Sequence, residues 1–105
     1  MIRHCVFIRF RPEVSAAERN ALFDAIAALK DRLPGIVAVH VGANVSPEAG
    51  MDKGYSDGFV VDFDGAAARD AYLEDADHRA VGARLAAAAE GGVDGILVYD
   101  IETAG

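Results

Sequence analysis

Four short apolar segments of this chain alternate in polarity like β-strands, and two longer stretches with helical spacing separate them. The strand-like segments cover residues 2–10, 36–45, 55–63 and 93–101, and the helical stretches cover residues 15–33 and 64–89. The order is therefore strand, helix, strand, strand, helix, strand, which is a split β-α-β pattern. It predicts an α+β fold: a ferredoxin-like sandwich with a four-stranded antiparallel sheet and its helices on one face.

The helix boundaries follow from capping residues. Ser15 and Glu18 have the spacing of a capping box, and the helix that begins there ends before Pro34-Gly35. Asp64 is predicted to be the N-cap of an alanine-rich helix that runs through Tyr72. The segment Asp75-Ala76-Asp77 predicts a break and a new N-cap, so the second helical stretch is expected in two pieces.

Two helices can cover only one face of a four-stranded sheet, so the other face must be polar or must meet another subunit. The first, second and last strand-like segments carry apolar residues on both faces. In residues 36–45, one face is expected to hold Val37, Val39, Val41 and Val45, and the other holds His40 and Asn44. A symmetric homodimer that pairs two such sheets would bury the second apolar surface.

Length and charge restrict the possible functions. The 105 residues fit one domain, residues 1–105, and 17 acidic against 10 basic residues give a net charge of −7, which disfavours nucleic acid as a partner. The single cysteine, Cys5, lies in an apolar strand and has no internal disulfide partner, which favours a buried thiol in a reducing cytoplasm. No secretory signal and no apolar run of roughly 20 residues is present, so we expect a cytoplasmic protein without a membrane segment.

Titratable side chains on apolar faces are the candidates for chemistry. His4 shares a strand face with Ile2, Val6 and Ile8, and Asp57 lies on the apolar face of residues 55–63. Asp57 would orient an imidazole by accepting a ring N–H, or His4 and Asp57 would form a buried pair that only satisfies the core.

Tyr72 and His78 follow on the second helical stretch. A neutral imidazole abstracts a proton beside a carbonyl, and a tyrosine hydroxyl donates a hydrogen bond to the developing enolate. The alternative is that Tyr72 packs as a helix-face aromatic residue and His78 occupies the first turn after the helix break.

Metal and cofactor motifs are weak. His4, Asp57 and His78 would make a two-histidine, one-carboxylate set if they converged, but no closely spaced ligand pair supports a site, and no metal is predicted. The glycines do not form a phosphate-binding fingerprint, so no cofactor is predicted. His40 is expected to meet solvent or a dimer partner.

Several segments together resemble the stress-responsive dimeric α/β-barrel (Dabb) domain. The resemblance covers nearly the whole chain, in the family's order and spacing. The matching segments are His4 to Phe10 followed by Pro12, then Pro34-Gly35-Ile36, Gly42 to Pro47, Gly54 to Asp57, and Tyr72 to His78.

This resemblance implies a monomer that dimerises into an α+β barrel and holds a pocket between sheet and helices. The implied pocket residues are His4, Val6, Ile8, Phe23, Ile26, Asp57 and Phe59. In the plant polyketide cyclases of this family a histidine and a tyrosine promote an aldol condensation, and His78 and Tyr72 match them. Asp57 stands where those cyclases have a second strand histidine, and Ile26 where they have a helix tyrosine, so the resemblance does not extend to the cyclases' substrate.

Three functional classes follow. The first is a stress-responsive protein that binds a small molecule, with no assigned reaction. The second is a cyclase or isomerase acting on a carbonyl or polyketide-like compound, with His78 as general base and Tyr72 as hydrogen-bond donor. The third is a non-catalytic structural or interaction module.

Overall fold

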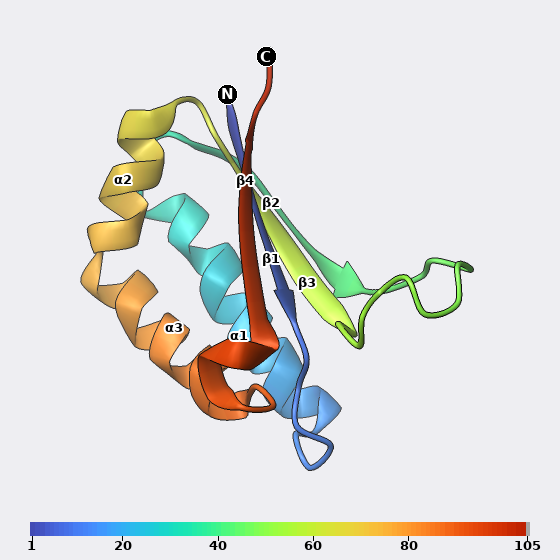
Figure 1. Cartoon of the computed structure of the whole chain (residues 1–105). Helices are drawn as coiled ribbons and strands as arrows, with labels where there is room; N and C mark the ends of the chain where they lie inside the picture. Colours follow the sequence, from blue (N-terminus) through green and yellow to red (C-terminus); the bar gives the residue numbers. More distant parts are fainter. Residues whose placement is uncertain (105) are drawn as a thin grey trace.

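The computed structural model describes residues 1–104 and shows one four-stranded antiparallel sheet (Figure 1). In chain order the elements are β1 (Ile2–Ile8), α1 (Ala16–Ala28), a 3-10 turn (Leu29–Asp31), β2 (Ile36–Ala43), β3 (Asp57–Phe63), α2 (Ala66–Glu74), α3 (Ala76–Ala88), a second 3-10 turn (Gly92–Gly95) and β4 (Ile96–Glu102). The strand order across the sheet is β2-β3-β1-β4.

The three helices lie together on one face of the sheet, and the other face is open (Figure 1). The long loop between β2 and β3 projects on the open side, and both termini lie at one end of the sheet (Figure 1). The predicted ferredoxin-like α+β fold with a four-stranded antiparallel sheet is confirmed.

The core lies between the sheet and the helices. The alternation of β1 places Ile8 on the helix side, and β3 places Val61 and Phe63 there, all three at 0% exposure. They belong to one buried cluster with Leu22 and Ile26 of α1. Each such side chain contributes roughly 1.5–3 kcal/mol when it leaves water, so this layer fixes the helices on the sheet.

Two of the three predicted helix caps are confirmed. The Ser15 hydroxyl accepts a hydrogen bond from the Glu18 backbone N–H at 3.1 Å, and the Asp75 carboxylate accepts one from the His78 N–H at 3.0 Å. The Asp64 prediction is wrong, because Gly65 holds the N-cap position of α2 and makes no side-chain cap. The Asp64 N–H instead donates a hydrogen bond to the Gly35 carbonyl at 2.9 Å, so Asp64 extends the pairing at the end of β3 and lies outside α2.

Of the four valines predicted to share one face of residues 36–45, only Val39 packs against the core, and Val37, Val41 and Val45 are exposed. The register shifts between Ile36 and Ala38, and Val37 is left 47% exposed beside this irregularity. β2 ends at Ala43, so Val45 lies in the following loop and is 92% exposed. A β-bulge reverses which side chains face the core, which alternation alone does not reveal.

Candidate functional site

Three of the predicted polar residues converge between the sheet and the helices. We call His4 of β1, Tyr72 of α2 and His78 of α3 the aromatic cluster. The ring centroids of His4 and Tyr72 are 5.7 Å apart in an edge-to-face arrangement, and those of Tyr72 and His78 are 4.0 Å apart. His4 is 3% exposed and Tyr72 is 1% exposed, whereas His78 is only half-buried and forms the outer side of the cluster.

The acidic partner of His4 is Asp100, which the sequence analysis did not single out. His4 and Asp100 are directly opposite each other on neighbouring β1 and β4, and the distance from Nδ1 to Oδ1 is 2.6 Å. The second carboxylate oxygen accepts a hydrogen bond from Arg69 Nη1 at 2.7 Å. Partial burial opposes ionisation, but the hydrogen bonds from Arg69 and His4 outweigh it and hold the pKa of Asp100 below its ordinary value.

Asp57 does not contact either histidine of the cluster, so the expected pairing with His4 is wrong. Its carboxylate accepts hydrogen bonds from Arg19 Nη1 at 3.2 Å and from the Ser56 hydroxyl at 2.7 Å. The register explains the separation: His4 faces Val61 on β3, four residues and about 13 Å along the strand from Asp57. His4, Asp57 and His78 therefore do not form one ligand set.

Two buried polar atoms of the cluster have no hydrogen-bond partner: Tyr72 Oη and His78 Nδ1. Burial raises the pKa of the Tyr72 hydroxyl, so it stays protonated and is a donor. Burial also lowers the pKa of His78, and the nearby His4 adds to the effect, whereas the Leu73 carbonyl and Asp75 oppose it. None of these groups reaches hydrogen-bonding geometry with Nδ1, so a neutral imidazole presents an unused ring nitrogen.

The remaining residues implied for the pocket are part of the packed core. Val6, Ile8, Phe23, Ile26 and Phe59 are all between 0% and 6% exposed. No member of the aromatic cluster lines the cavities of about 640 and 310 Å³ that the described residues form. Phe59 also lines a cavity on the other face of the sheet, which is described next.

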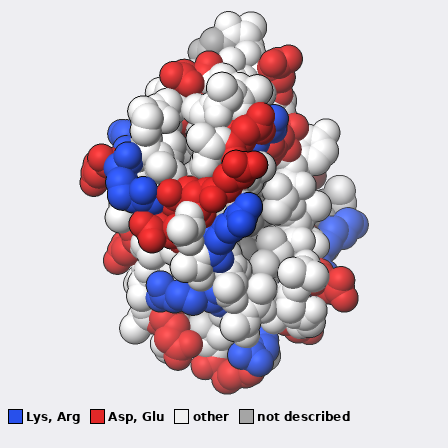
Figure 2. Space-filling model, turned by 90° about the vertical axis from the view of Figure 1, so that its left-hand side faces the viewer, with Lys and Arg blue, Asp and Glu red and all other residues white. Residues whose placement is uncertain are grey.

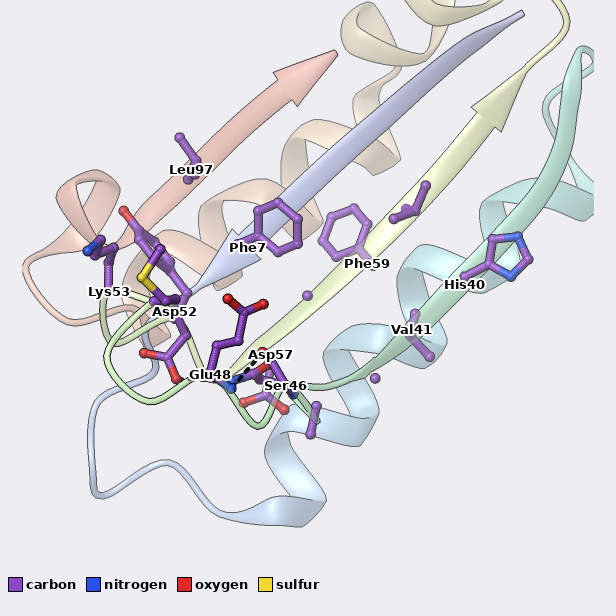
Figure 3. Close-up of a pocket in the computed structure, with 17 residues that line it drawn as sticks. Phe7, His40, Val41, Ser46, Glu48, Asp52, Lys53, Asp57, Phe59 and Leu97 are labelled. Atoms are coloured by element: carbon purple, nitrogen blue, oxygen red, sulfur yellow. Dashed lines mark hydrogen bonds between the residues drawn. The ribbon is translucent and has the colours of Figure 1, made fainter. Parts of the chain in front are cut away.

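That larger cavity lies on the open face of the sheet. Its volume is about 640 Å³, and we call it the open-face cavity (Figure 3). The loop between β2 and β3 forms one wall, and Glu48, Asp52 and Lys53 project from it around the sheet residues (Figure 3). All four strands contribute open-face residues to the floor, namely Phe7, His40, Gly42, Gly58, Val60 and Leu97.

Two further predictions concern single side chains. Cys5 is buried, as predicted, and this burial raises the pKa of its thiol. His40 is exposed on the open face, where its Nε2 lies 3.6 Å from Asp62. Asp62 also binds Arg3 through two hydrogen bonds of 2.8 and 3.2 Å.

The outer surface of the helices carries interspersed acidic and basic side chains, with acidic groups in the larger share (Figure 2). In this view of the described residues no extended basic area is present. Among residues 1–104, none of the helices is long and apolar enough to cross a bilayer.

The fold and the match to a family model define the class of this protein. The family model for the "Stress responsive A/B Barrel Domain" (Dabb) matches residues 2–103 of the sequence, and the chain belongs to this family. No curated protein sequence matches it.

Several solved structures share the fold. A dimeric ferredoxin-like protein of unknown function from Jannaschia sp. CCS1 is 30% identical, with 97% of this chain and 98% of that chain covered and a TM-score of 0.90. A second dimeric ferredoxin-like protein of unknown function, from Thermobifida fusca, is 24% identical, with coverage of 97% and 90% and a TM-score of 0.77. The hydroxynitrile lyase from Passiflora edulis is 17% identical, with coverage of 95% and 90% and a TM-score of 0.81, a likeness of fold alone.

Proposed function

We propose that this chain binds a small carbonyl compound at the aromatic cluster and works as a homodimer. The observation that carries the proposal is the pair of unpartnered buried atoms, Tyr72 Oη and His78 Nδ1. Buried polar groups are almost always hydrogen-bonded, and leaving one unpaired costs roughly 1–3 kcal/mol. A ligand with one acceptor for the Tyr72 hydroxyl and one donor for His78 Nδ1 would remove that cost at both atoms.

The partial exposure of His78 supports an entry route at this side of the cluster. Its ring packs against the Tyr72 ring at a centroid distance of 4.0 Å, so a ligand that enters beside His78 arrives next to the tyrosine. The ring is carried by the first turn of α3, directly after the break at Asp75 that separates α3 from α2. A small displacement of this turn would open the site without disturbing the sheet.

Proton transfer at the bound carbonyl compound is the second candidate function. The lowered pKa of His78 favours a neutral ring that accepts a proton from carbon, and the protonated Tyr72 hydroxyl is available to donate to the enolate oxygen. The hydrogen bond to Asp100 would hold His4 in one tautomer beside them. Polyketide-like and other small 1,3-dicarbonyl compounds suit this chemistry, because their acidic carbon lies between two acceptor oxygens.

The homodimer is supported by the dimeric relatives and by the open sheet face. The relatives from Jannaschia and Thermobifida fusca are described as dimeric. Phe7, Leu97, Tyr99 and Ile101 lie on the open face of this chain and are between 38% and 60% exposed. A second copy would remove this apolar surface from water.

Tyr72→Phe tests the binding proposal. If the hydroxyl binds the ligand, the variant loses ligand binding, and if Tyr72 only packs in the core, the variant binds as before. The substitution removes only an unpaired buried oxygen, so the free energy of unfolding should stay equal or rise by up to about 1 kcal/mol. Stabilisation by acetylacetone and longer 1,3-diketones, measured as a shift in melting temperature, should be lost in this variant and kept in Tyr55→Phe. If no diketone shifts the melting temperature of the unsubstituted protein, the binding proposal fails and a structural or interaction module remains.

His78→Ala separates binding from proton transfer. The unsubstituted protein should accelerate hydrogen–deuterium exchange at the central carbon of acetylacetone in D₂O above the spontaneous rate, measured by NMR, and His78→Ala should lose this acceleration if His78 is the base. The unfolding free energy should change by no more than about 1 kcal/mol, since the ring is half-buried. Equal exchange rates with and without the protein would reject catalysis while leaving binding intact.

A further inference from the structure

One arginine contacts both acidic residues at the junction between α2 and α3. Arg32 directly follows the 3-10 turn at the end of α1 and precedes Asp75 by 43 positions in the sequence. Its Nη2 donates a hydrogen bond to Oδ2 of Asp75 at 2.5 Å and lies 3.1 Å from Oδ2 of Asp77. The junction is therefore tied to the end of α1 through a single guanidinium nitrogen.

The oxygen of Asp75 that Arg32 binds is the same one that caps α3. Oδ2 of Asp75 also accepts a hydrogen bond from the backbone N–H of His78 at 3.0 Å. The hydrogen bond from Arg32 is the main cause of a pKa of Asp75 below its ordinary value, so the cap is a carboxylate anion at neutral pH. Hydrogen bonds to an ionised acceptor are stronger than those to a neutral one. Arg32 therefore acts on the first turn of α3 through an oxygen that it shares with His78.

Few other contacts fix this turn. Asp75 has an extended backbone, with φ −64° and ψ 134°, so a single non-helical residue connects the two helices. Arg79 Nε donates a hydrogen bond to the Leu73 carbonyl at 3.4 Å, but both residues lie at the junction itself. Within residues 1–104, Arg32 is the one side chain from another part of the fold that forms a hydrogen bond or an ion pair with Asp75 or Asp77. Its loss would leave the turn held by its own backbone and by packing.

We propose that Arg32 is a positioning residue for the aromatic cluster: it holds the first turn of α3 so that the His78 ring stays beside Tyr72. This inference rests on the proposed function, because it assigns a residue that sets the geometry of the same site. The centroids of the two rings are 4.0 Å apart, and a ring carried by a loosened turn would spend less time at that distance. A ligand held by Tyr72 Oη and His78 Nδ1 together needs both atoms in place beforehand, so its affinity would fall.

The contacts of Arg32 are not expected to stabilise the whole fold. The side chain of Arg32 is 49% exposed and that of Asp77 is 67% exposed, and ion pairs in such positions contribute little to stability. The side chain of Asp75 is only 13% exposed, so its contact with Arg32 is the less screened of the two. A local effect on His78 with little change in overall stability is therefore the signature of a positioning role.

Arg32→Gln tests the inference without any ligand. The imidazole protons of His78, identified in NMR spectra by their absence from His78→Gln, should be displaced by the ring current of Tyr72 in the unsubstituted protein. In Arg32→Gln they should move toward the positions of an exposed histidine, while the melting temperature and the amide signals of the sheet stay nearly unchanged.

Two further variants give matched controls. Arg11→Gln removes the same charge from a side chain that is also 49% exposed and pairs with Glu13 at 3.4 Å, and it should leave the His78 signals in place. Arg32→Lys should restore the signals of the unsubstituted protein, because both contacts come from one nitrogen that an ammonium group can replace.

Diketone binding tests the consequence for the site. The affinity for acetylacetone, measured by NMR titration, should fall roughly fivefold to tenfold in Arg32→Gln and stay unchanged in Arg11→Gln and Arg32→Lys. Asp77→Asn removes only the more exposed of the two contacts and should cause a smaller change of the same sign. This milder variant decides the question if Arg32→Gln does not fold.

The outcomes separate this inference from the proposed function. His78 signals that stay in place in Arg32→Gln would overturn the positioning role, whether or not a diketone binds. Displaced signals with an unchanged diketone affinity would also overturn it, because the turn would then move without affecting the site. Displaced signals in a protein that binds no diketone in any variant would reject the proposed ligand and still support the positioning of His78 by Arg32.

Discussion

His4 and Asp100 form a cross-strand pair in which the imidazole is buried and the carboxylate is partly exposed, with Nδ1 of the imidazole 2.6 Å from Oδ1 of the carboxylate. They come from the first and last strands, 96 residues apart, and the pair links β1 to β4 on the helix-covered face of the sheet. Arg69 of α2 binds the other carboxylate oxygen at 2.7 Å, so the pair also ties a helix to the sheet.

Asp100→Asn should destabilise the protein. The variant keeps the shape of the side chain but removes the charged acceptor from both His4 and Arg69, and His4 has almost no access to water. Loss of hydrogen bonds of this kind costs about 1–3 kcal/mol in the free energy of unfolding, measurable by urea denaturation. Asp24→Asn is the control, because Asp24 lies exposed on α1 and should change stability by less than about 0.5 kcal/mol. Equal effects of the two variants would mean that the pair contributes nothing.

His78 should make the stability fall in mild acid. Its pKa is lower in the folded state than the ordinary 6.5, so below that pH the unfolded chain binds a proton that the folded chain excludes. Its contribution is therefore intact above pH 6.5 and is lost as the pH falls from 6.5 toward the folded value. The unfolding free energies of the unsubstituted protein and of His78→Gln, measured from pH 8 to pH 5, should differ increasingly at the acid end, with the variant losing less. A difference that is constant with pH would contradict the lowered pKa.

Two glycines should respond to alanine with opposite signs. Gly35 has a φ of +90°, and a Cβ there would lie 2.5 Å from the Ala68 Cβ of α2, so Gly35→Ala should destabilise the fold by more than about 1 kcal/mol. Gly82 lies in the middle of α3 with open space around it, and Gly82→Ala should stabilise by roughly 0.5–1 kcal/mol. Thermal denaturation of both variants checks the pair, and equal shifts would show that the Gly35 contact relaxes freely.

The melting temperature should rise with protein concentration. A dimer that forms only from folded chains stabilises the folded state by mass action. Scans over a wide range of concentrations should show this rise for the unsubstituted protein. A melting temperature independent of concentration would count against a reversible dimer.

Local signals in the sequence predicted most of the elements correctly. The Ser15 and Asp75 caps depend on residues three positions away, and both are formed as the spacing indicates. Asp64 has the right residue type, but a backbone hydrogen bond to Gly35, 29 positions earlier, holds it outside the helix. The predictions that failed are those in which a distant segment decides the local geometry.

The same distinction applies to the candidate site. The sequence by itself determined the alternation that puts His4 on the buried face and the helix break that brings Tyr72 and His78 together, because these are short-range periodicities. The partner of His4 and the separation of Asp57 from it were decided only by the tertiary structure, since strand register fixes them through contacts between distant segments. The open-face cavity likewise exists only after all four strands are in register.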